Sequence, residues 1–103
     1  MRVNFKQQFE DIDGKFTEDQ YAQYAINAVM APNPGGTETG EQLLDKYDLG
    51  IRIKNSTTAG IEISHVEKEL ILKEIRRVYA TPLIYKRFTD LFKKAEEKLA
   101  KAK

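Results

Sequence analysis

The sequence contains no cysteine among its 103 residues, no tryptophan and a single histidine. The absence of cysteine excludes disulfide frameworks, thiolate metal sites and cysteine nucleophiles. A single histidine also excludes histidine-rich metal sites and two-histidine catalytic arrangements, and we expect no cofactor. No apolar run approaches the roughly 20 residues that a membrane helix requires. The first ten residues lack the apolar stretch of a secretory signal. We therefore expect a cytoplasmic protein with no membrane partner.

Hydrophobic residues make up 41% of the chain and charged residues 32%. This composition is too apolar for a disordered protein and too charged for a membrane protein. A chain of this length buries roughly 60–70% of its unfolded surface, which suffices for one core but not for two. The composition therefore predicts a single domain over residues 1–103.

Charge is distributed unevenly along the chain. Residues 1–50 contain 4 basic and 9 acidic side chains, a net charge of −5, whereas residues 73–103 contain 10 basic and 4 acidic side chains, a net charge of +6. Such an asymmetry could steer a charged partner toward the protein. The alternative, which is commoner, is that the two parts pack close together and partly neutralise each other.

Alternating polar and apolar residues over residues 2–10 predict a β-strand with one buried face. The buried side chains of this strand would be Val3, Phe5 and Phe9. Asp13-Gly14 is a strong turn signal, because glycine adopts positive φ without penalty. A short return strand at Lys15-Phe16 could follow this turn, and residues 61–63 form another candidate strand that could pair with the first.

The first helix is predicted from residue 17 to Met30. Thr17 and Gln20 have the spacing of a capping box, and apolar residues then recur at helical intervals. Residues 32–36, Pro-Asn-Pro-Gly-Gly, cannot continue a helix. Residues 31–40 are therefore predicted to form a flexible loop.

A second helix is predicted over residues 40–54. One apolar face of this helix contains Gly50, which indicates that another element approaches closely there. The other members of this face are Leu43, Leu44, Tyr47 and Ile51.

Two further helices complete the predicted fold. Ser64 and Glu67 form the clearest capping box of the chain, so a helix is predicted to begin after Ser64. This helix is apolar on two sides, which is typical of a central helix, covered within the monomer or by a second copy in a homo-oligomer. Pro82 suits the first position of the last helix, whose basic tail, residues 98–103, is expected to fray. The predicted fold class is α+β and predominantly helical, with four helices and a small antiparallel strand pair or hairpin formed by the N-terminus and residues 61–63.

Three local motifs resemble functional sites but lack the residues that such sites require. Asp11–Gly14 resembles part of a calcium loop, yet Phe9 and Gln20 occupy the positions of its end ligands. The glycine-rich segment 35–40 is followed by Glu41, where a phosphate loop needs lysine. His65 has no second histidine or cysteine with which to bind zinc. The sequence therefore predicts no catalytic or metal site, and we expect that the protein is not an enzyme.

The last helix carries the most suggestive surface feature. The stripe beside the apolar face consists of Arg87, Lys94, Lys98 and Lys101, and Lys86 and Lys93 lie further round the same side. Tyrosine on a surface often marks a protein interface, and Tyr85 lies at the edge of the apolar face. The predicted partner-binding residues are Tyr85, Lys86, Arg87, Lys93, Lys94 and Lys98, with the loop 31–40 as an adaptable element.

Nucleic acid is the alternative partner for a basic stripe, because lysine and arginine side chains can follow a row of phosphates. The residues proposed for this role are Arg76, Arg77, Arg87, Lys94 and Lys98. Two acidic residues, Asp90 and Glu97, interrupt the stripe and weaken its field. A merely solvated helix face is the third interpretation of the same pattern.

Four segments run in a characteristic order along the chain: FKQQFEDIDGK, AINAVMAP, GEQLLDKYDLGIRI and IEISHVEKELILKEIRRVYATPLIYKRF. In this pattern and order the chain resembles a group of small bacteriophage- and prophage-encoded proteins, most of them without assigned activity. The resemblance implies a viral origin and a cytoplasmic setting in a bacterial host, and it transfers no catalytic residue. The basic tail after Phe92 departs from the group's pattern.

We therefore expect a small non-enzymatic phage protein that acts by binding a macromolecule. Viral proteins of this size commonly block or redirect a host complex, so an inhibitor or modulator of a bacterial defence or regulatory complex is the first hypothesis. A nucleic-acid-binding accessory protein and a partner in particle assembly are the alternatives.

Overall fold

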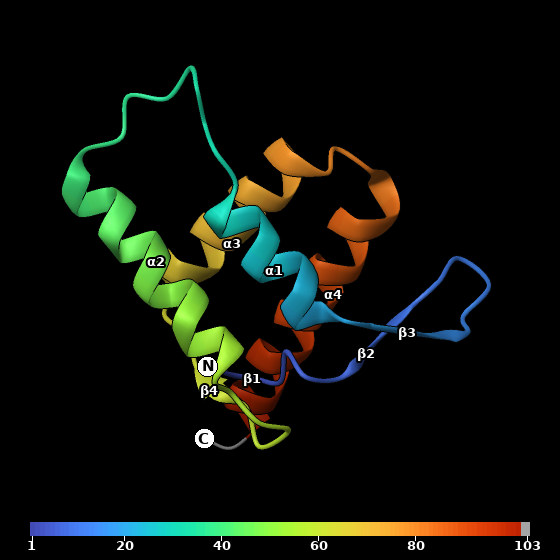
Figure 1. Cartoon of the computed structure of the whole chain (residues 1–103). Coiled ribbons are helices and arrows are strands. Elements are labelled where there is room, and N and C mark those ends of the chain that lie inside the picture. The colour runs from blue at the N-terminus through green and yellow to red at the C-terminus, as the bar shows by residue number, and fades with distance from the viewer. Residues whose placement is uncertain (102–103) are drawn as a thin grey trace.

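The computed structural model describes residues 1–101, which form four helices and two antiparallel strand pairs (Figure 1). The predicted α+β class with four helices is confirmed. The elements are β1 (Arg2–Val3), β2 (Gln8–Glu10), β3 (Phe16–Gln20), α1 (Tyr21–Met30), α2 (Gly40–Lys54), β4 (Ile61–Glu62), α3 (His65–Val78) and α4 (Pro82–Lys101). Of the tail predicted to fray, residues 98–101 continue α4, and residues 102–103 lie outside the described residues.

The predicted pairing between the N-terminus and residues 61–63 is confirmed. Strand β1 pairs antiparallel with β4, with Arg2 opposite Glu62 and Val3 opposite Ile61. The expectation of one continuous strand over residues 2–10 is wrong, because the chain turns between β1 and β2. The Lys6 backbone N–H donates to Asn4 Oδ1 at 2.9 Å, an asparagine turn that redirects the chain before Gln8.

The predicted helix start at Thr17 is also wrong. Residues 16–20 form β3, which pairs with β2 to make a hairpin that projects from the helices (Figure 1). Helix α1 begins at Tyr21, and its capping box is formed by Gln20 and Gln23. The first N–H groups of the helix, those of Tyr21 and Ala22, donate to the carbonyl oxygens of residues 7 and 5. Long-range pairing therefore overrides the local capping signal at Thr17.

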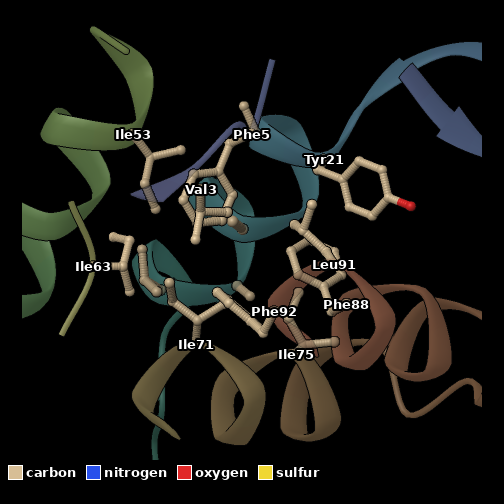
Figure 2. Packing of buried hydrophobic residues seen from close by; sticks show 14 of the residues in the cluster. Val3, Phe5, Tyr21, Ile53, Ile63, Ile71, Ile75, Phe88, Leu91 and Phe92 are labelled. Atoms are coloured by element: carbon tan, nitrogen blue, oxygen red, sulfur yellow. The ribbon is translucent and has the colours of Figure 1, made fainter. Parts of the chain in front are cut away.

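One cluster of buried side chains joins the strands to the helices (Figure 2). Phe5 packs edge-on against Phe92 of α4 with ring centroids 6.1 Å apart, and Tyr21 packs against Phe88 at 5.2 Å. The predicted inward face of the N-terminal segment is confirmed. Its three members, Val3, Phe5 and Phe9, are all buried.

Helix α2 turns a different face to the core from the one that its apolar residues mark. Its buried residues are Lys46, Leu49, Gly50 and Ile53. Leu43, Leu44 and Tyr47 are instead 53%, 65% and 54% exposed. Gly50 does lie where α1 approaches closely, because a Cβ atom there would collide with Met30 Cε.

The starts predicted for the last two helices are confirmed. The Glu67 N–H donates to Ser64 Oγ at 3.1 Å and the Ser64 N–H donates to Glu67 Oε1 at 2.9 Å, which completes the capping box of α3. Pro82 is the first residue of α4, and Ala80, at φ 51°, makes the turn before it. Helix α3 buries Ile71 and Ile75 together with an unexpected charged residue, Glu74.

Candidate functional site

A surface groove of about 580 Å³ runs between α4, the N-terminal segment and the loop before β4. We call it the α4 groove. Of the predicted partner-binding residues, Arg87, Lys93, Lys94 and Lys98 line it, together with Arg2 from β1. Residues far apart in the sequence thus contribute cations to one groove.

The groove-facing side of α4 alternates in charge. Arg87, Asp90, Lys94, Glu97 and Lys98 all line the groove and follow one another along this side of the helix. Steps of three and four residues place the first four on neighbouring turns, and Lys98 follows four residues after Lys94. Alternation of this kind makes the groove a patterned surface rather than a uniformly positive one.

Three lysines of the groove are exposed and keep their charges available. Lys93, Lys94 and Lys98 form no ion pair with any other residue of the described part of the chain. An exposed ammonium group without a partner can pair with an incoming carboxylate without first breaking an internal contact.

Arg87 has a structural role as well as its place at the groove. Its guanidinium donates from Nε to the Glu10 carbonyl oxygen at 3.0 Å and from Nη2 to the Asp11 carbonyl oxygen at 2.5 Å. These bonds tie the β2–β3 hairpin to α4. The helical spacing that placed Arg87 on the stripe could not indicate them, because the acceptors lie 76 and 77 residues away in the sequence.

Tyr85 and Lys86 lie outside the α4 groove. Tyr85 is about two and a half helical turns from Lys94, so the two side chains leave opposite sides of the helix. Lys86 Nζ donates to Asp90 Oδ1 at 2.9 Å, one turn along the helix surface. The structure therefore brings together four of the six predicted residues.

The arginines of α3 do not join this groove. Arg76 is exposed on α3 and is absent from the groove lining. Arg77 donates to Glu74 Oε2 at 2.7 Å, to the Pro32 carbonyl oxygen at 2.9 Å and to the Ala31 carbonyl oxygen at 3.3 Å. The five residues considered for nucleic-acid binding therefore do not form one surface, because Arg76 and Arg77 lie outside the groove that Arg87, Lys94 and Lys98 line.

A buried ion network lies between α2, α3 and the loop 31–39, and the sequence analysis missed it. Glu74 is fully buried and Lys46 is 6% exposed. Lys46 Nζ forms an ion pair with Glu74 Oε1 at 3.0 Å and donates to Glu38 Oε1. Arg77 Nη2 approaches Glu74 Oε2 at 2.5 Å. Two carboxylates and two cations therefore compensate one another, with Glu74 and Lys46 buried and Glu38 and Arg77 partly exposed.

The electrostatics of this network shift two ionisation equilibria. The hydrogen bond from Lys46, followed by one from Asn33, holds the pKa of Glu38 below its usual value. Burial would lower the pKa of Lys46, but hydrogen bonds and charges of Glu38 and Glu74 outweigh burial and raise it. Both groups are therefore held in their charged forms at neutral pH.

The network ties down the loop that was predicted to be flexible. Arg77 binds the carbonyl oxygens of Ala31 and Pro32, and Asn33 Nδ2 donates to Glu38 Oε1 at 3.2 Å. The loop, the end of α1 and the first half of α2 line a second, open hollow of about 480 Å³. The sequence did contain a signal for the network. The core side of each helix has a single charged residue, which is Lys46 near Leu49 in α2 and Glu74 between Ile71 and Ile75 in α3.

Within residues 1–101 no cluster of three or more potential ligands could hold a metal ion. Over the same residues no helix is both long enough and apolar enough to cross a membrane. Comparisons with protein-family models, with curated proteins and with solved structures find no match to this chain.

Proposed function

We propose that the protein acts by binding a larger protein through the α4 groove, without catalysing a reaction of its own. The observation that carries this proposal is a row of three exposed lysines in the α4 groove, Lys93, Lys94 and Lys98. They have no internal ion-pair partner in the described chain and lie beside Asp90 and Glu97. Charged groups arranged in this way select a partner by complementarity and speed its association.

The charge pattern favours a protein partner over nucleic acid. Asp90 and Glu97 face the same groove as the lysines and would repel a phosphate backbone. Arg77 and Arg87, which a phosphate-binding surface would need, donate to backbone carbonyl groups instead. A protein surface with separate acidic and basic side chains can match the alternation.

The identity of the partner follows, in this proposal, from the resemblance to phage and prophage proteins. We propose a bacterial host complex with a defence or regulatory role, which the protein inhibits or otherwise modulates in the host cytoplasm. A component of the phage particle is the second candidate, and the two differ in whether the partner is encoded by the host or by the phage.

The test is recovery of the partner from bacterial extract by the purified protein. The variant Lys94→Glu/Lys98→Glu should lose a partner that the unmodified protein recovers in stoichiometric amount. The matched control is Lys15→Glu/Lys73→Glu, which makes the same charge change at two exposed lysines outside the groove. Equal recovery by both double variants would remove the groove from the proposal.

The nucleic-acid alternative has its own test. A phosphate-binding protein retards duplex or single-stranded DNA at about 50 mM salt, and its affinity falls steeply as salt is added. We expect no retardation. A salt-dependent shift that Lys94→Glu/Lys98→Glu abolishes would establish the alternative instead.

A further inference from the structure

A continuous apolar stripe lies on the solvent side of α2. Leu43, Leu44 and Tyr47 are each more than half exposed, and Ile51 is partly exposed on the same side. Helix α2 lies at one edge of the molecule (Figure 1). Single exposed apolar residues are ordinary on a protein surface, but a contiguous group of large ones marks an interaction site.

The stripe has the spacing of a helix-packing seam. Leu44, Tyr47 and Ile51 are separated by three and then four residues, the interval at which one helix packs along another. From Leu43 to Ile51 the stripe is about 12 Å long at the rise of an α-helix. The core-facing residues Leu49 and Ile53 lie on another side, so α2 has two distinct apolar faces.

A preformed hollow adjoins the stripe. Leu43 and Tyr47 form one wall of the second hollow, and Met30, Pro32 and Pro34 belong to its other walls. The loop that carries the two prolines is held by Arg77, which donates to the Pro32 carbonyl oxygen. The hollow can therefore receive a large apolar side chain without first ordering the loop, and preorganisation lowers the cost of binding.

The opposite flank of the stripe is acidic. Glu41, Asp45 and Asp48 are exposed and recur at intervals of four and three residues along α2. None of them forms an ion pair within residues 1–101. A partner that packs on the stripe therefore meets three uncompensated carboxylates on one side.

We propose that the outer face of α2 is a second docking surface, and that its occupant is an amphipathic helix with lysine or arginine along one flank. The apolar seam of that helix packs on Leu44, Tyr47 and Ile51, and one of its large apolar side chains enters the hollow. Its basic flank lies against the three carboxylates. This surface is separate from the α4 groove, so the protein can hold two partners at once.

A second copy of this chain is a poorer occupant. Two α2 helices packed antiparallel would place each acidic flank against the same flank of the other copy. Like charges at a helix interface disfavour pairing. A basic amphipathic helix instead satisfies both the apolar seam and the acidic flank.

The experiment titrates the ¹⁵N-labelled full chain with two designed helical peptides that share one apolar heptad seam. One peptide has lysine at every flanking position and the other has glutamate. We expect amide shifts along α2 and the 31–39 loop with the lysine peptide, and an affinity lower by about tenfold or more for the glutamate peptide. Shifts confined to other elements, or no binding of either peptide, would overturn the proposal.

Two double variants, each with a control variant, locate the peptide-binding surface. Leu44→Ser/Tyr47→Ser should lower the affinity for the lysine peptide by about tenfold or more, whereas Val66→Ser, at an exposed apolar residue of α3, should leave it unchanged. Asp45→Lys/Asp48→Lys should reverse the preference in favour of the glutamate peptide, and Asp13→Lys/Glu18→Lys should not. Peptide binding should not depend on the α4 groove. The variant Lys94→Glu/Lys98→Glu should therefore bind the lysine peptide with the same affinity as the unmodified protein.

Sedimentation of the unmodified chain completes the test. We expect a monomer at the concentrations of the titration. A dimer that Leu44→Ser/Tyr47→Ser dissociates would show that a second copy occupies the stripe, and would contradict the proposed occupant.

Discussion

Lys46 and Glu74 show how far a tertiary contact can be predicted from single residues. Each is the one charged side chain on the core side of its helix, and the two are of opposite sign. The pattern of apolar residues on α2 favoured the wrong face because Leu43, Leu44 and Tyr47 outnumber the apolar residues that face the core. To predict the ion pair, a lysine at a core position of one helix has to be matched with a glutamate at a core position of another. Local sequence patterns cannot make that match, because only the tertiary fold brings the two residues into contact.

Replacing Lys46 by methionine should destabilise the fold. The change leaves the fully buried Glu74 with Arg77 as its remaining cation. Breaking a buried ion pair in this way costs roughly 3 kcal/mol, the lower end of the usual range, because Arg77 still compensates part of the charge. Urea unfolding measures the loss. Lys54→Met, at an exposed position of the same helix, should change stability by less than about 0.5 kcal/mol, and equal effects would contradict the role of the network.

Gly60 is required by backbone geometry. Its φ is +86°, and a Cβ atom there would stand 2.9 Å from the Val3 carbonyl oxygen of β1. Gly60→Ala should therefore destabilise the protein by about 1–3 kcal/mol. Gly40→Ala is the matched control, because nothing lies near its Cβ position and alanine favours a helix. Thermal unfolding should show a lower midpoint for the first variant alone.

At the scale of elements, sequence signals correctly predicted helix starts that depend only on neighbouring residues. The capping box of Ser64 and Glu67 and the proline at residue 82 correctly predicted where α3 and α4 begin, since cap and proline geometry need only neighbouring residues. Thr17 failed as a cap because residues 16–20 pair with β2. The same limit applies to the candidate site. Helical spacing identified the lysines of the α4 groove but could not show that Arg87 binds the hairpin.

The β2–β3 hairpin should depend on Arg87. Arg87→Met keeps the apolar stem of the side chain but removes its two hydrogen bonds to the Glu10 and Asp11 carbonyl groups. Hydrogen bonds from charged donors contribute about 1.5–3 kcal/mol, so the Asp11 and Gly14 amides should exchange with solvent roughly tenfold faster or more. Exchange rates of the α3 amides should not change. In the control variant Lys93→Met, no amide should change its exchange rate. Unchanged exchange in the hairpin would show that Arg87 does not anchor it.

Over the whole molecule, no internal ion pair of residues 1–101 joins an acid of residues 1–50 to a base of residues 73–101, so ion pairing leaves the charge asymmetry in place. Glu38 bonds to Lys46 within the first part, and Lys68 bonds to Glu96 across α3 and α4 at 2.7 Å. The acidic flank of α2 and the lysines of the α4 groove form no such pairs in residues 1–101. Both surfaces that we propose for binding therefore contain unpaired charges: carboxylates on the outer face of α2, and lysines beside Asp90 and Glu97 in the α4 groove.

The paired carboxylates predict a loss of stability in acid. The bond from Lys68 lowers the pKa of Glu96; for Glu67, burial would raise the pKa, but bonds from Ser64 and Arg52 outweigh burial and lower it. The unfolded chain therefore binds more protons near these pKa values, so the free energy of unfolding falls as pH drops below about 4.5. Glu67→Gln, which can still cap α3, should show a shallower fall between about pH 5 and pH 3. An identical pH dependence would contradict the lowered pKa of Glu67.

Photo-cross-linking in bacterial cells tests the central claim most directly. A photoreactive residue at position 93 lies in the α4 groove and leaves Lys94 and Lys98 in place, whereas the same residue at position 73 lies on α3 outside the groove. The account predicts one dominant protein adduct from position 93, lost when Lys94→Glu/Lys98→Glu is added, and none from position 73. A nucleic-acid adduct at position 93, or equal yields from the two positions, would contradict it.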